Sequence, residues 1–224
     1  MKKILAAVII IYIAIQLPNI FTEQYHFTDE MLYAWLSFKY GQDPSNLFLN
    51  ESVHWTRPLI PLLAAPLTHL IHPLYAIRLF ALFISVIGIF AIYFLGKKFG
   101  TKTTGLLSSI FLAFSPAYYY FSTQGMLTIP LAVASILFIY FFINYLENKS
   151  IIPAATISGL AVLIQSTGFI FPVFLAAGTA YKNRKKKEKL LLTLVAALIV
   201  FVIILLILTS LPTFPEYFSR ISQQ

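Results

Sequence analysis

The sequence predicts an all-α polytopic membrane protein, with about seven transmembrane helices and one or two interfacial helices in its first outer loop. Hydrophobic residues make up 59% of the 224 residues and charged residues only 11%, whereas soluble domains are about a quarter charged. Apolar stretches near the length that crosses roughly 30 Å of hydrocarbon occur seven times. This pattern excludes a soluble enzyme and a disordered tail, and the absence of cysteine excludes disulfides and thiolate metal sites.

The predicted spans follow one another with short connections after the first loop. We expect Ser115-Pro116 to bend the third span near its outer end. The fifth and sixth stretches are short, so they are either two thin spans that meet at the polar turn beginning at Gln165 or one broken helix. The seven stretches are residues 4–21, 74–95, 104–121, 126–146, 151–164, 168–181 and 190–208.

The distribution of Lys and Arg favours two spans over residues 151–181 and predicts the orientation of the chain in the membrane. Lys and Arg concentrate in cytoplasmic loops, and twelve of the sixteen lie on one side if residues 151–181 cross twice. The prediction is one membrane domain, 1–224, with a cytoplasmic N-terminus, an uncleaved first span and a basic cytoplasmic loop at 182–189. Loop 22–73 and tail 210–224 are then extracytoplasmic. Topology thus accounts for the net charge of +8, and we expect no nucleic-acid partner.

The outer loop 22–73 is long enough to carry function. Thr28 is suited to cap a helix that Gly41 would end, lying on the membrane surface. Its predicted apolar face repeats at helical spacing and consists of Met31, Leu32, Trp35 and Leu36.

Asp29 and Glu30 fall in the first turn of this predicted helix. One interpretation is that they complement the positive end of the helix dipole. The other is catalytic, because a carboxylate pair at the bilayer edge is placed to act on a lipid headgroup as a general base. The sequence leaves both open.

Arg57 precedes a second predicted helix, which Pro58 would start and Pro61 and Pro66 would keep short. A cation beside the free amides of a helix start suits a phosphate, and an arginine that reaches the membrane interface is the alternative. The four histidines match no metal spacing, so no metal site is predicted, and His54 joins Arg57 as a phosphate-binding candidate.

Few polar residues lie within the spans. Arg78, near the start of the second span, is expected to reach the outer interface or face a cavity there. No acid falls inside a span, which argues against an ion-coupled transporter.

Several motifs, in this order, resemble the polyprenyl-phosphate-dependent membrane glycosyltransferases of the GT-C superfamily, in particular the branch of protein mannosyltransferases and aminoarabinose transferases. They are an acidic motif at 28–33, a basic-Pro-Leu motif at 57–62, an arginine at 78, a basic turn at 95–100, Ser-Pro at 115–116 and Gly-Leu-Ala at 159–161. The similarity extends from Ile4 to Tyr181 and corresponds to the core module of the superfamily.

The resemblance implies that a sugar on a polyprenyl phosphate is transferred, with inversion, to an extracytoplasmic acceptor. Asp29 would be the general base and Glu30 would orient the site, while the lipid phosphate would be held by Arg57, His54 and Arg78. No cofactor or divalent metal is implied. Candidates for acceptor binding or for the second outer loop are Tyr33, Gln124, Thr128 and Gln165, of which the last two stand where relatives often carry charge.

Two other functions remain open from the sequence. The chain resembles only the core module, which fits a non-catalytic polyprenyl-lipid-binding or scaffold subunit whose partner supplies further spans. The broken fifth and sixth spans fit a transporter of lipids or small solutes.

Overall fold

A computed structural model describes residues 2–22, 28–43 and 59–182. These residues form helices without a strand, which confirms the all-α prediction. The elements are α1 (Lys2–Ile20), α2 (Thr28–Gln42), α3 (Leu59–Ala64), the 3-10 helix η2 (Ala65–His69), α4 (Pro73–Phe99), α5 (Lys102–Ala113), α6 (Pro116–Phe121), α7 (Thr128–Leu146), α8 (Ile152–Ile164), the 3-10 helix η3 (Ser166–Phe169) and α9 (Ile170–Lys182).

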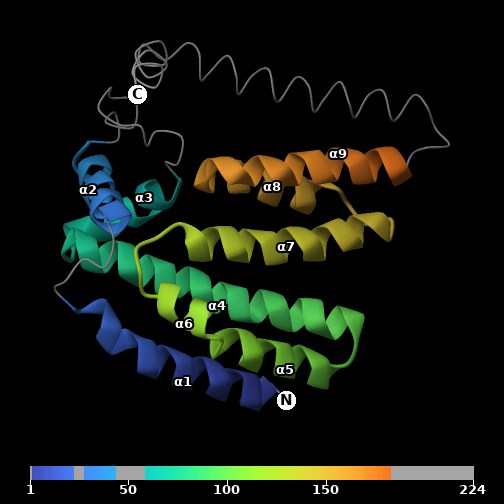
Figure 1. The fold of residues 1–224 in the computed structure, drawn as a ribbon, viewed down its shortest axis with the longest axis horizontal. Coiled ribbons are helices and arrows are strands. Elements are labelled where there is room, and N and C mark those ends of the chain that lie inside the picture. Colours follow the sequence, from blue (N-terminus) through green and yellow to red (C-terminus); the bar gives the residue numbers. More distant parts are fainter. Residues whose placement is uncertain (1, 23–27, 44–58, 183–224) are drawn as a thin grey trace, which may run out of the picture.

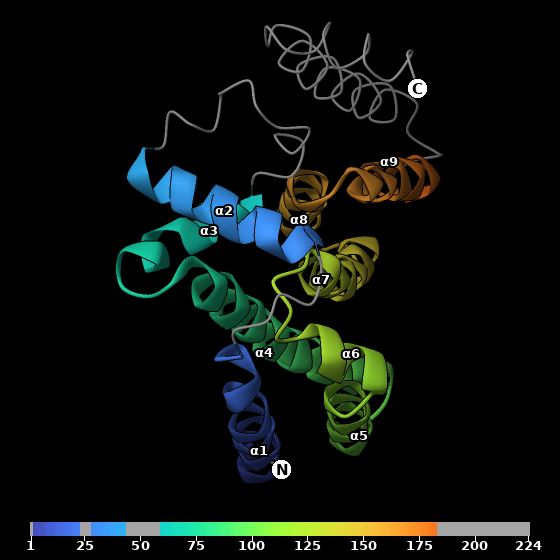
Figure 2. The same cartoon turned by 60° about the vertical axis from the view of Figure 1, so that its left-hand side comes forward.

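The long helices lie lengthwise beside one another, with α4 between α5 and α7 and with α8 on the other side of α7 (Figure 1). Helix α2 lies across one end of this bundle together with α3 (Figure 2). The described helices of the predicted outer loop therefore cover one end of the bundle.

Three of the described helices, α1, α4 and α7, are long and apolar enough to cross a membrane. Helices α8 and α9 have 13 residues each, about 20 Å at 1.5 Å per residue. The protein is an integral membrane protein by the length and composition of these helices. The seventh predicted span, 190–208, lies outside the described residues.

The third predicted span is divided where the sequence placed a bend. Helix α5 ends at Ala113, and Pro116 opens the short helix α6. The residue before a proline is disfavoured in the helical region, and Ser115 is accordingly extended, with ψ at 133°. The Ser-Pro pair thus breaks the helix rather than bending it.

Residues 151–181 form two helices that meet at a polar turn, as predicted. Helix α8 ends at Ile164, the backbone of the next residue, Gln165, is extended, and η3 leads into α9. Helix α9 then lies along α8 and ends at the same end of the bundle as α7 (Figure 1).

Helix α2 differs from the prediction in its length and in its buried face. Gly41 does not end the helix, which continues to Gln42. A Cβ at Gly41 would lie 2.5 Å from Thr68 Oγ1, so the glycine allows η2 to approach α2 closely. Of the predicted apolar face, Leu36 is buried while Met31 and Trp35 are exposed, and the placement of this face on a membrane surface stays a prediction. The buried face consists of Tyr33, Ala34, Leu36, Ser37 and Tyr40.

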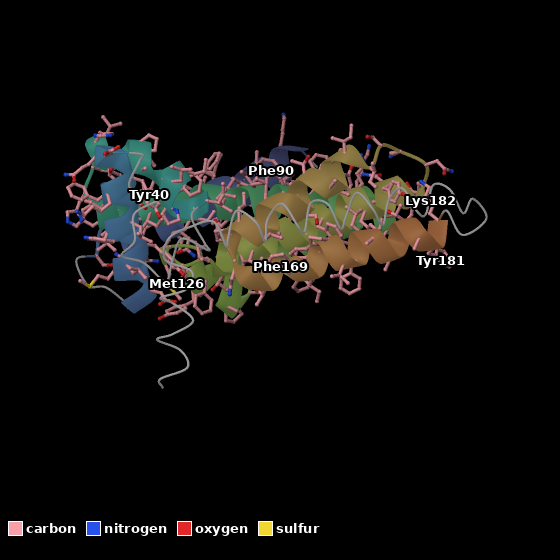
Figure 3. The ribbon with its side chains drawn as sticks, turned by 90° about the horizontal axis from the view of Figure 1, so that it is seen from above. Tyr40, Phe90, Met126, Phe169, Tyr181 and Lys182 are labelled. Atoms are coloured by element: carbon pink, nitrogen blue, oxygen red, sulfur yellow. The ribbon has the colours of Figure 1, made fainter. Side chains whose placement is uncertain are left out.

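Three lysines, Lys98, Lys149 and Lys182, lie at the end of the bundle opposite α2. Lys98 and Lys149 both donate hydrogen bonds to Asn144 Oδ1, at 2.7 and 2.9 Å. Lys182 donates to the carbonyl of Tyr145 and lies over its ring. Figure 3 places Lys182 at one end of the molecule and Tyr40 at the other. Which side of the membrane this end faces stays a prediction.

Candidate functional site

The first turn of α2 places two carboxylates in different environments. The Asp29 side chain is half-buried, whereas that of Glu30 is fully enclosed. Among the described residues Asp29 forms no hydrogen bond or ion pair. One acid of the predicted pair is therefore accessible, and the other is part of the interior.

Glu30 forms a buried bidentate ion pair with Arg78 of α4. Arg78 Nε donates to Glu30 Oε1 at 2.7 Å and Nη2 donates to Oε2 at 2.9 Å. Both side chains are 0% exposed. A guanidinium and a carboxylate match in this two-bond geometry, which is stronger and more directional than a single contact. The pair fixes the start of α2 on α4.

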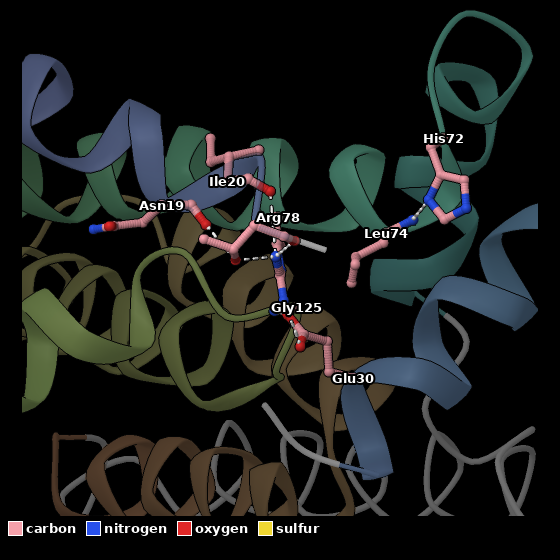
Figure 4. Close-up of polar contacts among 8 residues, drawn as sticks. Asn19, Ile20, Glu30, His72, Leu74, Arg78 and Gly125 are labelled. Atoms are coloured by element: carbon pink, nitrogen blue, oxygen red, sulfur yellow. Dashed lines mark hydrogen bonds and ion pairs between the residues drawn. The ribbon is translucent and has the colours of Figure 1, made fainter. Parts of the chain in front are cut away.

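The third nitrogen of Arg78 binds the chain at the end of α1. Nη1 donates to the carbonyl of Thr22 at 2.7 Å, to its hydroxyl at 2.8 Å and to the carbonyl of Ile20 at 3.2 Å (Figure 4). The last carbonyls of a helix have no hydrogen-bond donors within the helix. Here the guanidinium of Arg78 is the donor for the carbonyl of Ile20. Arg78 thus joins α1 and α2 to α4.

The loop between α6 and α7 completes the network through Gly125. Its N–H donates to Glu30 Oε1 at 2.9 Å. A Cβ at Gly125 would lie 2.5 Å from Ile77 Cγ2 and 3.2 Å from Glu30 Cγ, so this close approach requires glycine. Three segments far apart in the sequence therefore meet on one ion pair.

Arg78 is fully buried, so its guanidinium is enclosed by the protein rather than exposed at the surface. A charge within an apolar helix is stabilised by an opposite charge, and Glu30 provides one. Arg78 was also predicted to hold the lipid phosphate. Its guanidinium contacts Glu30, Thr22 and the carbonyl of Ile20, and its contact with a phosphate stays a prediction.

The remaining predicted residues divide into two groups. Gln124 is buried next to Gly125 and lies at the network. Tyr33 is buried in the apolar core below α2, Thr128 is exposed at the start of α7, and Gln165 is half-buried at the end of α8. The predicted role of these three residues in acceptor binding stays a prediction.

Arg57 and His54 lie outside the described residues, so their predicted place beside a phosphate stays a prediction. Among the described histidines, His72 caps the start of α4. Its Nδ1 accepts from Leu74 N at 3.3 Å at the start of α4.

Sequence reasoning missed the pairing of Glu30 with Arg78 and the contribution of Thr22. The signal was present for the first, because a single arginine in an apolar span and an acid at the bilayer edge need opposite charges nearby. The contact that Arg78 makes with the backbone carbonyl of Thr22 could not be predicted from the type of side chain at that position.

The comparisons with known proteins agree with this arrangement. A family model described as dolichyl-phosphate-mannose-protein mannosyltransferase matches residues 56–207, more than half of the chain. The match includes Arg57, Arg78 and Gln124 and begins after α2, so Asp29 and Glu30 precede it. No curated protein and no solved structure matches the chain.

Proposed function

The chain belongs to the dolichyl-phosphate-mannose-protein mannosyltransferase family, a family of membrane glycosyltransferases, and we propose that it transfers a sugar from a polyprenyl-phosphate donor to an extracytoplasmic acceptor with inversion. The observation that carries the proposal is the buried Glu30–Arg78 pair. The pair joins α4, which lies within the residues matched by the family model, to the first turn of α2, and it leaves the neighbouring Asp29 half-buried.

In the proposed step an acceptor hydroxyl oxygen attacks the anomeric carbon of the sugar. The bond between that carbon and the phosphate oxygen breaks, and its electron pair leaves with the polyprenyl phosphate. Asp29 takes the proton of the hydroxyl as general base. Inversion requires the attacking oxygen, the anomeric carbon and the leaving oxygen to lie on one line. Fixing α2 on α4 holds the base in place for this alignment.

Arg57 is proposed to hold the leaving phosphate, with His54 beside it. A phosphate that leaves as an anion needs a cation rather than a proton donor. The base and this cation would supply the charges that the step requires, and we propose that no divalent metal takes part.

We further propose seven crossings, with the lysine-rich end of the bundle in the cytoplasm. Lys98, Lys149 and Lys182 gather at that end, in agreement with the excess of cations in cytoplasmic loops. Asp29 and Glu30 would then lie on the extracytoplasmic side, where a lipid-linked donor and its acceptor meet.

Native mass spectrometry of the purified full chain tests the proposal. We expect wild type to carry polyprenyl phosphate or its sugar conjugate and Arg57→Ala to lose it. Lys39→Ala is the matched control, because Lys39 is a cation on α2 that lies over the ring of Trp35.

The outcomes separate the possible functions. Retention of the lipid by Arg57→Ala would contradict the role of Arg57. The absence of any bound polyprenyl lipid, even when it is supplied in excess, would overturn the proposal. Bound lipid without sugar transfer by the reconstituted chain would favour a lipid-binding subunit of a larger complex.

A further inference from the structure

A small polar pocket adjoins the ion-pair network. It has a volume of about 180 Å³ and lies between the end of α1, the helix α6 and the loop that leads to α7. Pockets for drug-sized ligands measure roughly 300–1,000 Å³, so this one suits a single small ring. Its described lining consists of three side-chain amides, two threonines and two tyrosines, without a charged residue.

Gln124 supplies the observation that points to a ligand. Its side chain is 4% exposed and lines the pocket. Its Oε1 accepts no hydrogen bond from the described residues. A buried amide oxygen without a donor costs about 1–3 kcal/mol. This oxygen is therefore suited to accept from a group that enters the pocket.

Gln16 forms the opposite wall and is held in a fixed orientation. It is fully buried although it belongs to the apolar helix α1. Its Nε2 donates to the carbonyl of Tyr119 at 2.7 Å, and its Oε1 accepts from Asn19 Nδ2 at 3.2 Å. Burying an amide side chain costs free energy of folding unless the amide is hydrogen-bonded. The polar lining is thus an ordered part of the fold.

The pocket shares residues with the ion-pair network. Thr22 both lines the pocket and accepts from Arg78. Gln124 precedes Gly125, whose N–H binds the Glu30 carboxylate, and Asp29 precedes Glu30. Gln124 and Asp29 are therefore the chain neighbours of the two residues that this hydrogen bond joins.

We propose that this pocket, the amide pocket, binds the sugar ring of the lipid-linked donor and that the ring is an uncharged polyhydroxylated sugar. Gln124 Oε1 accepts a hydrogen bond from a ring hydroxyl. Amides and hydroxyls match hydroxyl groups because each can donate and accept, and the described lining offers no charge to balance an amino or acidic sugar. This inference rests on the proposed function.

The test measures the gain in affinity that the sugar provides. The full chain in lipid nanodiscs is titrated with polyprenyl phosphate, with its mannosyl, glucosyl and galactosyl conjugates, and with its mannosaminyl conjugate. We expect at least one neutral conjugate to bind about tenfold more tightly than polyprenyl phosphate, the effect of one net hydrogen bond. The mannosaminyl conjugate, which carries an ammonium group, should show no such gain.

Three variants assign the gain to the amide pocket. Gln124→Leu should abolish it while binding of polyprenyl phosphate itself is unchanged. Asn19→Ala should reduce it, and because Asn19 is exposed this second variant is expected to fold if Gln124→Leu does not. Gln42→Leu, the same change at an exposed position at the end of α2, should retain the full gain.

The possible failures are distinguishable. If polyprenyl phosphate binds but no neutral sugar adds affinity, the amide pocket proposal is overturned and the proposed function stands. It is also overturned if both pocket variants keep the full gain. If no polyprenyl lipid binds at all, the proposed function fails, and the amide pocket proposal fails with it.

Discussion

The two ends of the bundle hold their charges in contrasting ways. At the lysine-rich end Lys98 pairs with Glu147 at 2.5 Å, with side chains 16% and 52% exposed. At the α2 end Arg78 pairs with Glu30 at 2.7 Å, and both side chains are fully buried. The separations of the charges are similar, and their surroundings differ.

Surroundings decide what each pair does. An exposed pair is screened by water and contributes little to stability. A buried pair must stay complete, because losing one partner leaves a charge in a medium of low dielectric. The exposed pair at the lysine-rich end is therefore expected to matter little for stability, while the α2 end depends on a specific contact that holds the proposed site together.

Breaking the buried pair should have the largest effect on stability. Arg78→Met leaves Glu30 as an uncompensated buried acid and is expected to lower the free energy of unfolding by about 3–5 kcal/mol. Unfolding in mixed detergent micelles measures this loss. Lys98→Met at the exposed pair is the control, and an equal loss in both variants would contradict the distinction between the two ends.

Removing both buried charges should restore much of this stability. The double variant Glu30→Met/Arg78→Met is expected to regain about 2–4 kcal/mol relative to Arg78→Met, because no buried charge remains unpaired. The same unfolding measurement gives the coupling energy. If the two single losses simply add, the residues do not act as a pair.

The close approach of Gly125 should have a smaller effect. Gly125→Ala places a Cβ 2.5 Å from Ile77 Cγ2 and should cost about 1–3 kcal/mol through overpacking. Gly159→Ala is the matched control, since a Cβ there meets nothing within 4 Å and alanine is favoured within a helix. A loss as large in the control would show that the close approach at Gly125 is not the cause.

The exposed pair should contribute the smallest effect, visible only as a pH dependence. The hydrogen bond from Lys98 lowers the pKa of Glu147 below its ordinary value of 4.5. The stabilisation from a depressed carboxyl pKa is present above the ordinary value and is lost as the pH falls through the lowered one. Carboxyl NMR titration should show the pKa of Glu147 rising in Lys98→Gln. A pKa that stays low in this variant would contradict the assignment to Lys98.

Local features of the fold could be predicted from the sequence. The position of Thr28 before two acids and the Ser115-Pro116 pair each act within a few residues: α2 begins at Thr28, and the chain changes direction at Ser115, although as a break rather than the predicted bend. The end of α2 was misplaced because Gly41 accommodates Thr68, a neighbour brought by the tertiary structure. Periodicity within one helix likewise did not reveal which face α3 and η2 would cover.

The candidate site was predictable only in part for the same reason. Asp29 and Glu30 were recognised by type and by their place after a span, but their different burial depends on Arg78, 48 residues along the chain from Glu30. Gln124 was identified as a polar loop residue, while its unpaired oxygen emerges only from the packing of α1 against α6.

Sugar transfer by the Asp29→Asn variant tests the central claim most directly. The reconstituted chain is given a polyprenyl-phosphate sugar and an acceptor, and the transferred sugar is counted. Asp43→Asn, a change of the same kind at the other end of α2, is the control and should keep wild-type transfer. If Asp29 is the general base, its amide variant should lose roughly 10²–10⁴-fold in rate while still binding the lipid. Transfer at the wild-type rate by Asp29→Asn would contradict the account.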